Sequence, residues 1–352
     1  MKKIITKIFN YLKYVICIII FLVLCFFLYS VYIKFFVESK SLENIKPQNT
    51  EIIQININGN QEEVASQEYN SSSGEVVIFV GGLSGWGDTW SRSILEFNKN
   101  TKNRYRVIVI DIPPFGFSEK SKENNYNRVS QAKRINTFIE NKNLKDVIFV
   151  AHSYGAGLAA EAILQNKSYY KKFIIIDGAL SIKSLEIKLV NNVDSNNNFS
   201  LDVKEKYNFL ENIKKSLLSS IIRVVVHTDF IAKNRLESFV NITSNIDKSL
   251  VDKYVFPTYK KESSNKLGDW ANQYVSESKN NMSNNIENYK SLSIPVRLIW
   301  GEEDTLTPIK ETEILLKNVS DIKIRKLKGV GHIPMIEDYK NFDEALINSI
   351  NN

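Results

Sequence analysis

A serine at the end of an apolar segment is the first residue in this sequence whose surroundings suggest chemistry. Val147–Ala151 is typical of a short buried strand, His152 and Ser153 follow it, and small residues then open a helix. Such a turn holds its central residue in a strained backbone conformation, and small neighbours leave room for the crossing chain. Ser153 is therefore a candidate nucleophile, although a plain strand-to-helix turn would give the same pattern.

Candidate partners for Ser153 lie far downstream in the sequence. His332 is near the C-terminal end, and an acidic run that ends at Asp304 follows the apolar segment Val296–Trp300. A histidine titrates near neutral pH, so it can accept the serine proton and later deliver it to a leaving group. An aspartate behind it would hold the imidazole tautomer and stabilise the imidazolium. Asp177, at the end of another apolar segment, is the alternative acid.

Five motifs, in this order, resemble those of the α/β-hydrolase family. They are IFVGGLSG (78–85), DIPPFGFS (111–118), AHSYGAG (151–157), GEEDTLTP (301–308) and GHIP (331–334). The resemblance selects Asp304 among its acidic neighbours and implies a catalytic triad of Ser153, Asp304 and His332. Ala151 replaces the first glycine usual at the serine turn, and Pro114 replaces a glycine of the second motif, whose residues we expect to be structural.

The same resemblance implies an oxyanion hole formed by the backbone N–H groups of Leu83 and Tyr154. The glycines before Leu83 let the backbone approach a substrate closely, although a simple tight turn would also contain them. Gly81 stands where the family commonly has a histidine.

No metal or organic cofactor is expected. The three histidines, His152, His227 and His332, have no ligand spacing, and His152 is expected to point away from the serine turn. Cys17 and Cys25 both lie in the apolar N-terminal stretch. A disulfide framework or a cysteine metal site in the globular part is thereby excluded.

Alternating apolar and amphipathic segments predict an α/β fold with a doubly wound, mostly parallel sheet. The expected strands are Val76–Val80, Tyr105–Ile110, Val147–Ala151, Phe173–Ile176, Val296–Trp300 and Ile322–Leu327. The expected helices cover 88–98, 127–142, 154–166, 309–318 and 340–350. An antiparallel hairpin that turns near Asn58-Gly59 precedes them.

Residues 181–290 lack this alternation and indicate an inserted helical cap, with helices at 203–225, 229–240 and 264–279. Aromatic residues of this segment either line an acyl-binding pocket or pack within the cap; they are Phe230, Tyr254, Phe256, Trp270 and Tyr274. The expected organisation is an anchor (1–38), a linker (39–50), a hydrolase core (51–180 and 291–352) and the cap.

Tyr14–Ile33 contains twenty residues without a charge, enough for a helix of ~30 Å across a bilayer. We interpret it as an uncleaved single-pass membrane anchor, because it is long for a signal peptide and no small-x-small site follows. Four lysines precede the segment and fewer net cations follow it, which predicts that the rest of the chain lies outside the cytoplasm.

The net charge of +7 does not indicate nucleic-acid binding. Six lysines and one glutamate fall within residues 1–40, so most of the excess accompanies the anchor. No basic stripe is evident on the remaining chain.

These features predict a serine hydrolase that cleaves an ester or related acyl bond of a small molecule through an acyl-enzyme intermediate. A proline-type aminopeptidase would use the same triad with acidic cap residues such as Glu237 and Asp269 to hold an amine. A C–C bond hydrolase and an acyltransferase are further alternatives. A non-catalytic binding module is the alternative from a different class.

Overall fold

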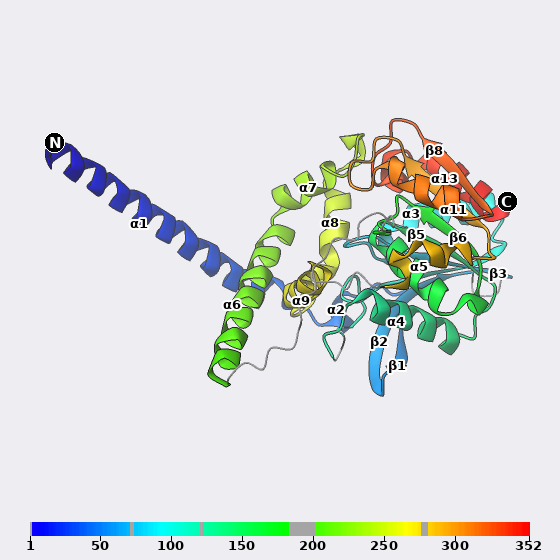
Figure 1. Ribbon diagram of the computed structural model, residues 1–352, viewed down its shortest axis with the longest axis horizontal. Helices are drawn as coiled ribbons and strands as arrows, with labels where there is room; N and C mark the ends of the chain where they lie inside the picture. The colour runs from blue at the N-terminus through cyan, green and yellow to red at the C-terminus, as the bar shows by residue number, and fades with distance from the viewer. Residues whose placement is uncertain (1, 71–73, 120, 122, 183–200, 276–280) are drawn as a thin grey trace.

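One sheet organises the chain. In the computed structural model, which describes residues 2–70, 74–119, 121, 123–182, 201–275 and 281–352, eight strands lie in the order β1-β2-β4-β3-β5-β6-β7-β8 (Figure 1). They are β1 Thr50–Ile57, β2 Asn60–Tyr69, β3 Glu75–Val80, β4 Tyr105–Ile110, β5 Val147–His152, β6 Tyr170–Ile176, β7 Val296–Gly301 and β8 Ile322–Leu327. Strands β3 to β8 pair in parallel, and β1 and β2 are antiparallel. The predicted fold class is confirmed.

The sheet is covered on both faces because its central strands are apolar on both faces. Every residue of β5 is buried, as expected for a parallel strand between two layers of helices. Two large apolar clusters result, one with α4 and α5 and the other with α3 and α13. The core helices are α3 Ser91–Asn100, α4 Arg128–Asn141, α5 Tyr154–Gln165, α11 Glu313–Asn318, α12 Pro334–Glu337 and α13 Tyr339–Asn351.

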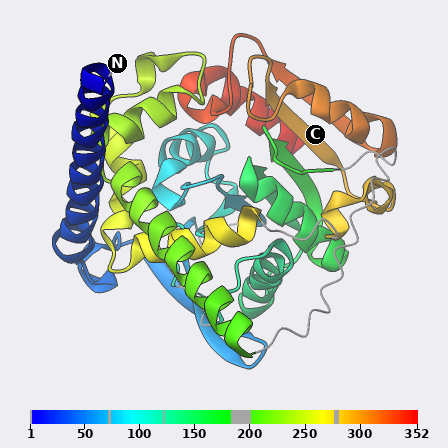
Figure 2. The same cartoon turned by 60° about the vertical axis from the view of Figure 1, so that its left-hand side comes forward.

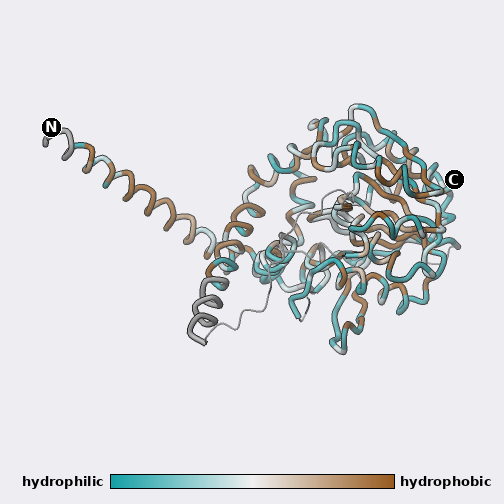
Figure 3. The backbone as a smooth tube through the Cα atoms, viewed as in Figure 1, coloured by the Kyte–Doolittle hydropathy of each residue, from teal (hydrophilic) through white to brown (hydrophobic). Residues whose placement is uncertain are grey.

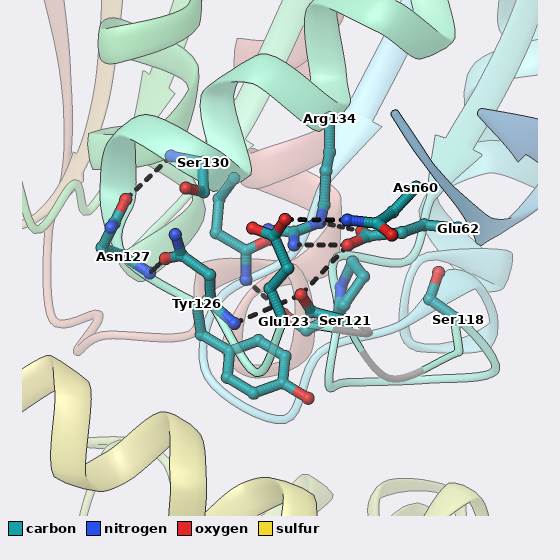
Figure 4. Close-up of polar contacts among 12 residues, drawn as sticks. Asn60, Glu62, Ser118, Ser121, Glu123, Tyr126, Asn127, Ser130 and Arg134 are labelled. Atoms are coloured by element: carbon teal, nitrogen blue, oxygen red, sulfur yellow. Dashed lines mark hydrogen bonds and ion pairs between the residues drawn. The ribbon is translucent and has the colours of Figure 1, made fainter. Parts of the chain in front are cut away.

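The hairpin β1–β2 joins the core through a buried ion pair, drawn in Figure 4. Arg134 on α4 donates to Glu62 on β2 at 2.6 Å, and both side chains are almost fully buried. Ser121 donates to the same carboxylate at 3.0 Å. Loss of either charge would leave the other buried without a partner, so this contact fixes the hairpin against α4.

The cap consists of α6 Leu201–Val226, α7 Asp229–Glu237, α8 Lys248–Val255 and α9 Ser263–Val275. It lies between α1 and the sheet in Figure 1, and Figure 2 shows α6 running across the front of the molecule. Helix α8 was not among the predicted helices. Of the predicted cap, 183–200 and 276–280 lie outside the described residues.

The last part of the predicted cap range packs against helices of the core and not against the cap. The short helix α10, Ile286–Lys290, packs against α11, and the turn before it packs against α5. The N–H of Ser283 donates to Glu161 of α5 at 2.8 Å. This part of the segment therefore covers the core rather than the cap.

The N-terminal helix α1, Lys2–Tyr32, projects from the globular part and is continued by a π-helix, Ile33–Val37 (Figure 1). Figure 3 shows its apolar character along most of its length. The span Lys7–Val37 is long and apolar enough to cross a membrane, and few residues of its apolar stretch are buried inside the protein. Phe21, for example, is 62% exposed.

A buried polar cluster joins the end of this helix to the cap. The Glu38 carboxylate accepts from Arg223 at 3.3 Å, contacts His227 at 3.2 Å, and accepts from the Ser264 hydroxyl. Arg223 also donates to Ser30 of α1 at 3.0 Å. We call these five residues the anchor–cap cluster. The cluster fixes the position of α1 relative to α6 and α9.

Candidate active site

Ser153 lies at the turn between β5 and α5. Its φ of 50° and ψ of −123° are an unusual conformation for a side-chain-bearing residue. The turn is tight: a Cβ added to Gly155 would lie 2.4 Å from the carbonyl oxygen of Gly81. Position 155 therefore requires glycine, whereas the chain accommodates the methyl group of Ala151 inside the strand.

The structure brings the three predicted triad residues into one hydrogen-bonded chain. Ser153 Oγ lies 2.8 Å from His332 Nε2, and His332 Nδ1 lies 2.8 Å from Asp304 Oδ2. All three residues are at least nine-tenths buried. Asp304 follows β7 and His332 follows β8, so both arrive at the carboxyl ends of parallel strands, where β5 also delivers Ser153.

Asp304 is held ionised by its neighbours. Its Oδ1 accepts from the N–H groups of Leu306 and Thr307 at 2.8 and 3.0 Å, and its Oδ2 accepts from the Thr307 hydroxyl at 2.6 Å. Burial opposes ionisation, but the hydrogen bonds from His332 and Thr307 outweigh it and lower the pKa of Asp304. Sequence reasoning did not single out Thr307, although it occupies the position before the proline of its motif.

Asp177, the alternative acid, occupies a different position. It directly follows β6, and its Oδ1 accepts from the Gly301 N–H at 2.8 Å. Its Oδ2 has no hydrogen-bond partner among the described residues. Burial, and then the nearby charge of Asp304, raises the pKa of Asp177 well above its ordinary value. Burial and this charge therefore favour the protonated form of Asp177.

His152 supports the loop that carries His332. Its Nε2 lies 2.8 Å from the His332 carbonyl oxygen, and a Cβ on Gly82 would fall 2.9 Å from its Nδ1. Burial, followed by the proximity of His332, lowers the pKa of His152 to about 3. The ring is therefore neutral and donates from Nε2 to the carbonyl.

The two predicted oxyanion donors flank Ser153. A Cβ on Gly82 would lie 2.8 Å from Ser153 Cβ, so the glycine-rich loop with Leu83 runs directly against the serine. Tyr154 is the first residue of α5, where backbone N–H groups carry the positive end of the helix dipole. Its side chain accepts a hydrogen bond from Trp270 at 3.0 Å, which ties α5 to the cap helix α9.

A small cavity of ≈ 50 Å³ opens beside the triad. Apolar side chains dominate its lining, among them Leu83, Leu236, Phe239, Leu306 and Met335. Drug-sized ligands fill pockets of roughly 300–1,000 Å³, so this cavity holds only part of such a ligand. Its walls also contain Arg235 of α7, which sequence reasoning missed because nothing in the local sequence indicates which way α7 faces.

The predicted aromatic residues of the cap have different surroundings, and not all of them line the cavity or pack within the cap. Tyr254 lines the cavity. Phe256 packs near Trp86 and Phe117, and Phe230 is 72% exposed. Tyr274 stacks on Trp270.

Among the described residues that line the cavity, none is acidic. Glu237 instead pairs with Lys233 along α7, and Asp269 lies on α9. An amine-binding site made from these two acids therefore has no support in this arrangement.

The cap also contacts the loop that carries His332. The His332 N–H donates to the Phe239 carbonyl at 2.9 Å. The Glu337 carboxylate accepts from the N–H groups of Gly331 at 2.9 Å and Asn241 at 2.7 Å. One carboxylate thus holds the histidine loop and the end of α7 together.

The described part of the chain contains no group of three or more His, Cys, Asp or Glu side chains arranged to hold a metal ion. The chemistry available at this site is that of a buried, hydrogen-bonded serine with a histidine base and a carboxylate.

Known proteins resemble this chain in sequence and in fold. Residues 75–339 match the family model described as the alpha/beta hydrolase fold. The uncharacterized hydrolase YugF of Bacillus subtilis is 24% identical over 66% of this chain and 75% of its own length. Lipase 3 of a Moraxella species is 22% identical over 79% of this chain and 80% of its own.

Among solved structures, the crystal structure of a membrane phospholipase A, a bacterial virulence factor, is similar with a TM-score of 0.62 at 15% identity. The similarity covers 96% of this chain and 98% of that one. The family match, which spans most of the chain, and the hydrolase relatives show that this protein is a hydrolase-type enzyme that belongs to the α/β-hydrolase fold family.

Proposed function

We propose that the protein is a membrane-anchored serine hydrolase that cleaves an ester or related acyl bond through an acyl-enzyme intermediate. The observation that carries this proposal is the hydrogen-bonded chain Ser153–His332–Asp304, with both hydrogen bonds at 2.8 Å. The strained conformation of Ser153 at the strand-to-helix turn supports the same role.

The mechanism follows from these contacts. Ser153 Oγ attacks the substrate carbonyl while His332 Nε2 takes its proton, and Asp304 stabilises the imidazolium. The N–H groups of Leu83 and Tyr154 receive the oxyanion. His332 then protonates the leaving group, and a water molecule, activated by the same nitrogen, hydrolyses the acyl-enzyme. No cofactor takes part in these steps.

The apolar span Lys7–Val37 supports the anchoring. The similarity to the membrane phospholipase A extends over nearly the whole chain, and a relative is named as a lipase. Together with the apolar cavity lining, these likenesses favour substrates with an acyl chain. The lysines that precede the span favour an extracytoplasmic catalytic domain.

The direct test is labelling with a fluorophosphonate probe, which reacts with activated serines. We expect the wild-type membrane fraction to be labelled and to hydrolyse p-nitrophenyl esters. Ser153→Ala should lose labelling and several orders of magnitude in kcat while it remains folded by circular dichroism. Ser168→Ala, at an exposed serine, is the matched control. Undiminished labelling of Ser153→Ala would reject the nucleophile, and an unlabelled wild type would favour a binding module.

A further inference from the structure

The cavity beside Ser153 contains a guanidinium group without a counter-ion. Arg235 lines it together with Gly82, Leu83 and His332, and no acidic side chain lines it among the described residues. Among the residues that the structure describes, the Arg235 side chain forms no ion pair or hydrogen bond. Its Nε is buried without a partner. The cation therefore faces the cavity without a protein anion to balance it.

Two fully buried arginines of this protein differ from Arg235, which is only partly buried. Arg134 pairs with Glu62 at 2.6 Å, and Arg223 pairs with Glu38 at 3.3 Å. A partly desolvated charge without a partner is unfavourable for folding, and a ligand that supplies the opposite charge would offset that cost. Burial lowers the pKa of Arg235, yet a guanidinium stays protonated in proteins.

A second donor accompanies this arginine. Tyr254 of α8 lines the same cavity, and burial raises the pKa of its hydroxyl group above the ordinary value. The hydroxyl therefore stays protonated at neutral pH and can donate a hydrogen bond. Among the described residues it makes no side-chain hydrogen bond to the protein.

We propose that Arg235 and Tyr254 form a subsite for an anionic group, a carboxylate or a phosphate, that the substrate carries close to its scissile acyl bond. The planar fork of a guanidinium matches two oxygens of either anion, and the tyrosine hydroxyl adds a third donor. This proposal rests on the proposed function, because it places the anion in the cavity where Ser153 would react. It narrows the substrate class from acyl esters in general to anionic ones.

Two pairs of esters test the subsite and identify the source of the anion. The carboxylate pair is mono-p-nitrophenyl glutarate and p-nitrophenyl 5-methylhexanoate, which have the same size and shape. The phosphate pair is a 1-acylglycerol 3-phosphate and the 1-acylglycerol with the same chain.

We expect wild-type kcat/KM to favour the anionic member of at least one pair. Arg235→Gln should reduce that preference about 10- to 100-fold, mainly through KM, because charged hydrogen bonds contribute that much. Arg235→Lys should keep part of it.

Lys233→Gln is the matched control, because it removes a charge from the same helix at an exposed position. It should leave the preference between anionic and neutral esters unchanged. A wild-type preference for the neutral member of both pairs would overturn the proposal. An anionic preference that Arg235→Gln retains in full would also overturn it.

Binding to Ser153→Ala separates this proposal from the proposed function, because it requires no turnover. Calorimetry with monomethyl glutarate and with glycerol 3-phosphate should give a Kd for at least one probe that rises tenfold or more in Ser153→Ala/Arg235→Gln. Equal affinities in the two variants for both probes would reject the subsite, whatever the labelling experiment shows about Ser153.

Discussion

Two carboxyl groups, those of Asp304 and Asp177, lie close to each other near His332. Their environments shift their pKa values in opposite directions. Asp304 receives hydrogen bonds from His332, Thr307 and Leu306, whereas Asp177 receives one from Gly301 and has a raised pKa. Such a separation of pKa values commonly marks distinct roles. In the proposed mechanism, Asp304 is the group that stabilises the imidazolium.

We therefore expect Asp304→Asn to lose about three to four orders of magnitude in kcat, because an amide neither stabilises the imidazolium nor favours the required tautomer. Asp177→Asn should keep most of the activity, since asparagine has the shape of the protonated acid. Steady-state kinetics with one p-nitrophenyl ester compares the two. The reverse ranking would transfer the catalytic role to the end of β6.

Asp177 also makes stability depend on pH. Its pKa is raised in the folded protein, so above its ordinary value of 3.8 the unfolded chain releases a proton that the folded chain keeps. Folding therefore becomes less favourable as the pH rises from about 4 towards the raised pKa. Asp177→Asn removes this penalty, and its Tm should exceed that of the wild type by about 2 °C or more at pH 7. The two melting curves should converge near pH 4; a constant difference would contradict the assignment.

At the scale of elements, the histidine loop depends on a contact with the cap. Glu337 accepts hydrogen bonds from Gly331 and Ile333 in the loop and from Asn241 and Ile242 after α7. This carboxylate fixes where His332 stands, although it lies outside the triad. The cap is thus part of the support of the site as well as its cover.

Glu337→Ala should lower kcat about tenfold or more and reduce the Tm by several degrees, because several backbone donors lose a charged acceptor. Glu344→Ala, at an exposed position of α13, is the control and should change neither. Kinetics and thermal unfolding measure both effects. A folded Glu337→Ala protein with wild-type kcat would show that the loop holds its position without this contact.

The strands and turns that have a clear pattern in the local sequence were predicted correctly. The strands before Ser153 and Asp304 are apolar runs bounded by turns, and the hairpin turns at Asn58-Gly59, both at positive φ, as predicted. Helix α8 has only eight residues, too few for a clear period. Arg235 could not be predicted as a cavity residue, because its exposure to the cavity depends on how the cap docks, which no local pattern encodes.

At the scale of the whole molecule, the proposed membrane anchor would determine on which side of the membrane the site operates. Four lysines precede the apolar span and fewer net positive charges follow it. From the positive-inside tendency we therefore expect the N-terminus to lie in the cytoplasm and the catalytic domain to lie outside.

Protease added to intact cells or spheroplasts, with any outer membrane opened, should digest the globular domain. A cytoplasmic protein monitored in the same sample should remain intact, and an exposed surface protein should be cleaved. A domain that survives while the exposed protein is cleaved would reverse the orientation.

The anchor–cap cluster sets the boundary of any soluble fragment of this protein. Glu38 lies just beyond the apolar span, yet its carboxylate is the partner of buried Arg223 and His227 in α6 and the segment after it. A fragment that begins at residue 39 removes the anion and leaves Arg223 buried without its ion-pair partner, which is strongly destabilising. A fragment that begins at Tyr29 keeps both Ser30 and Glu38 while it discards most of the apolar helix. We therefore expect that purification without detergent depends on retaining the last turns of the N-terminal helix.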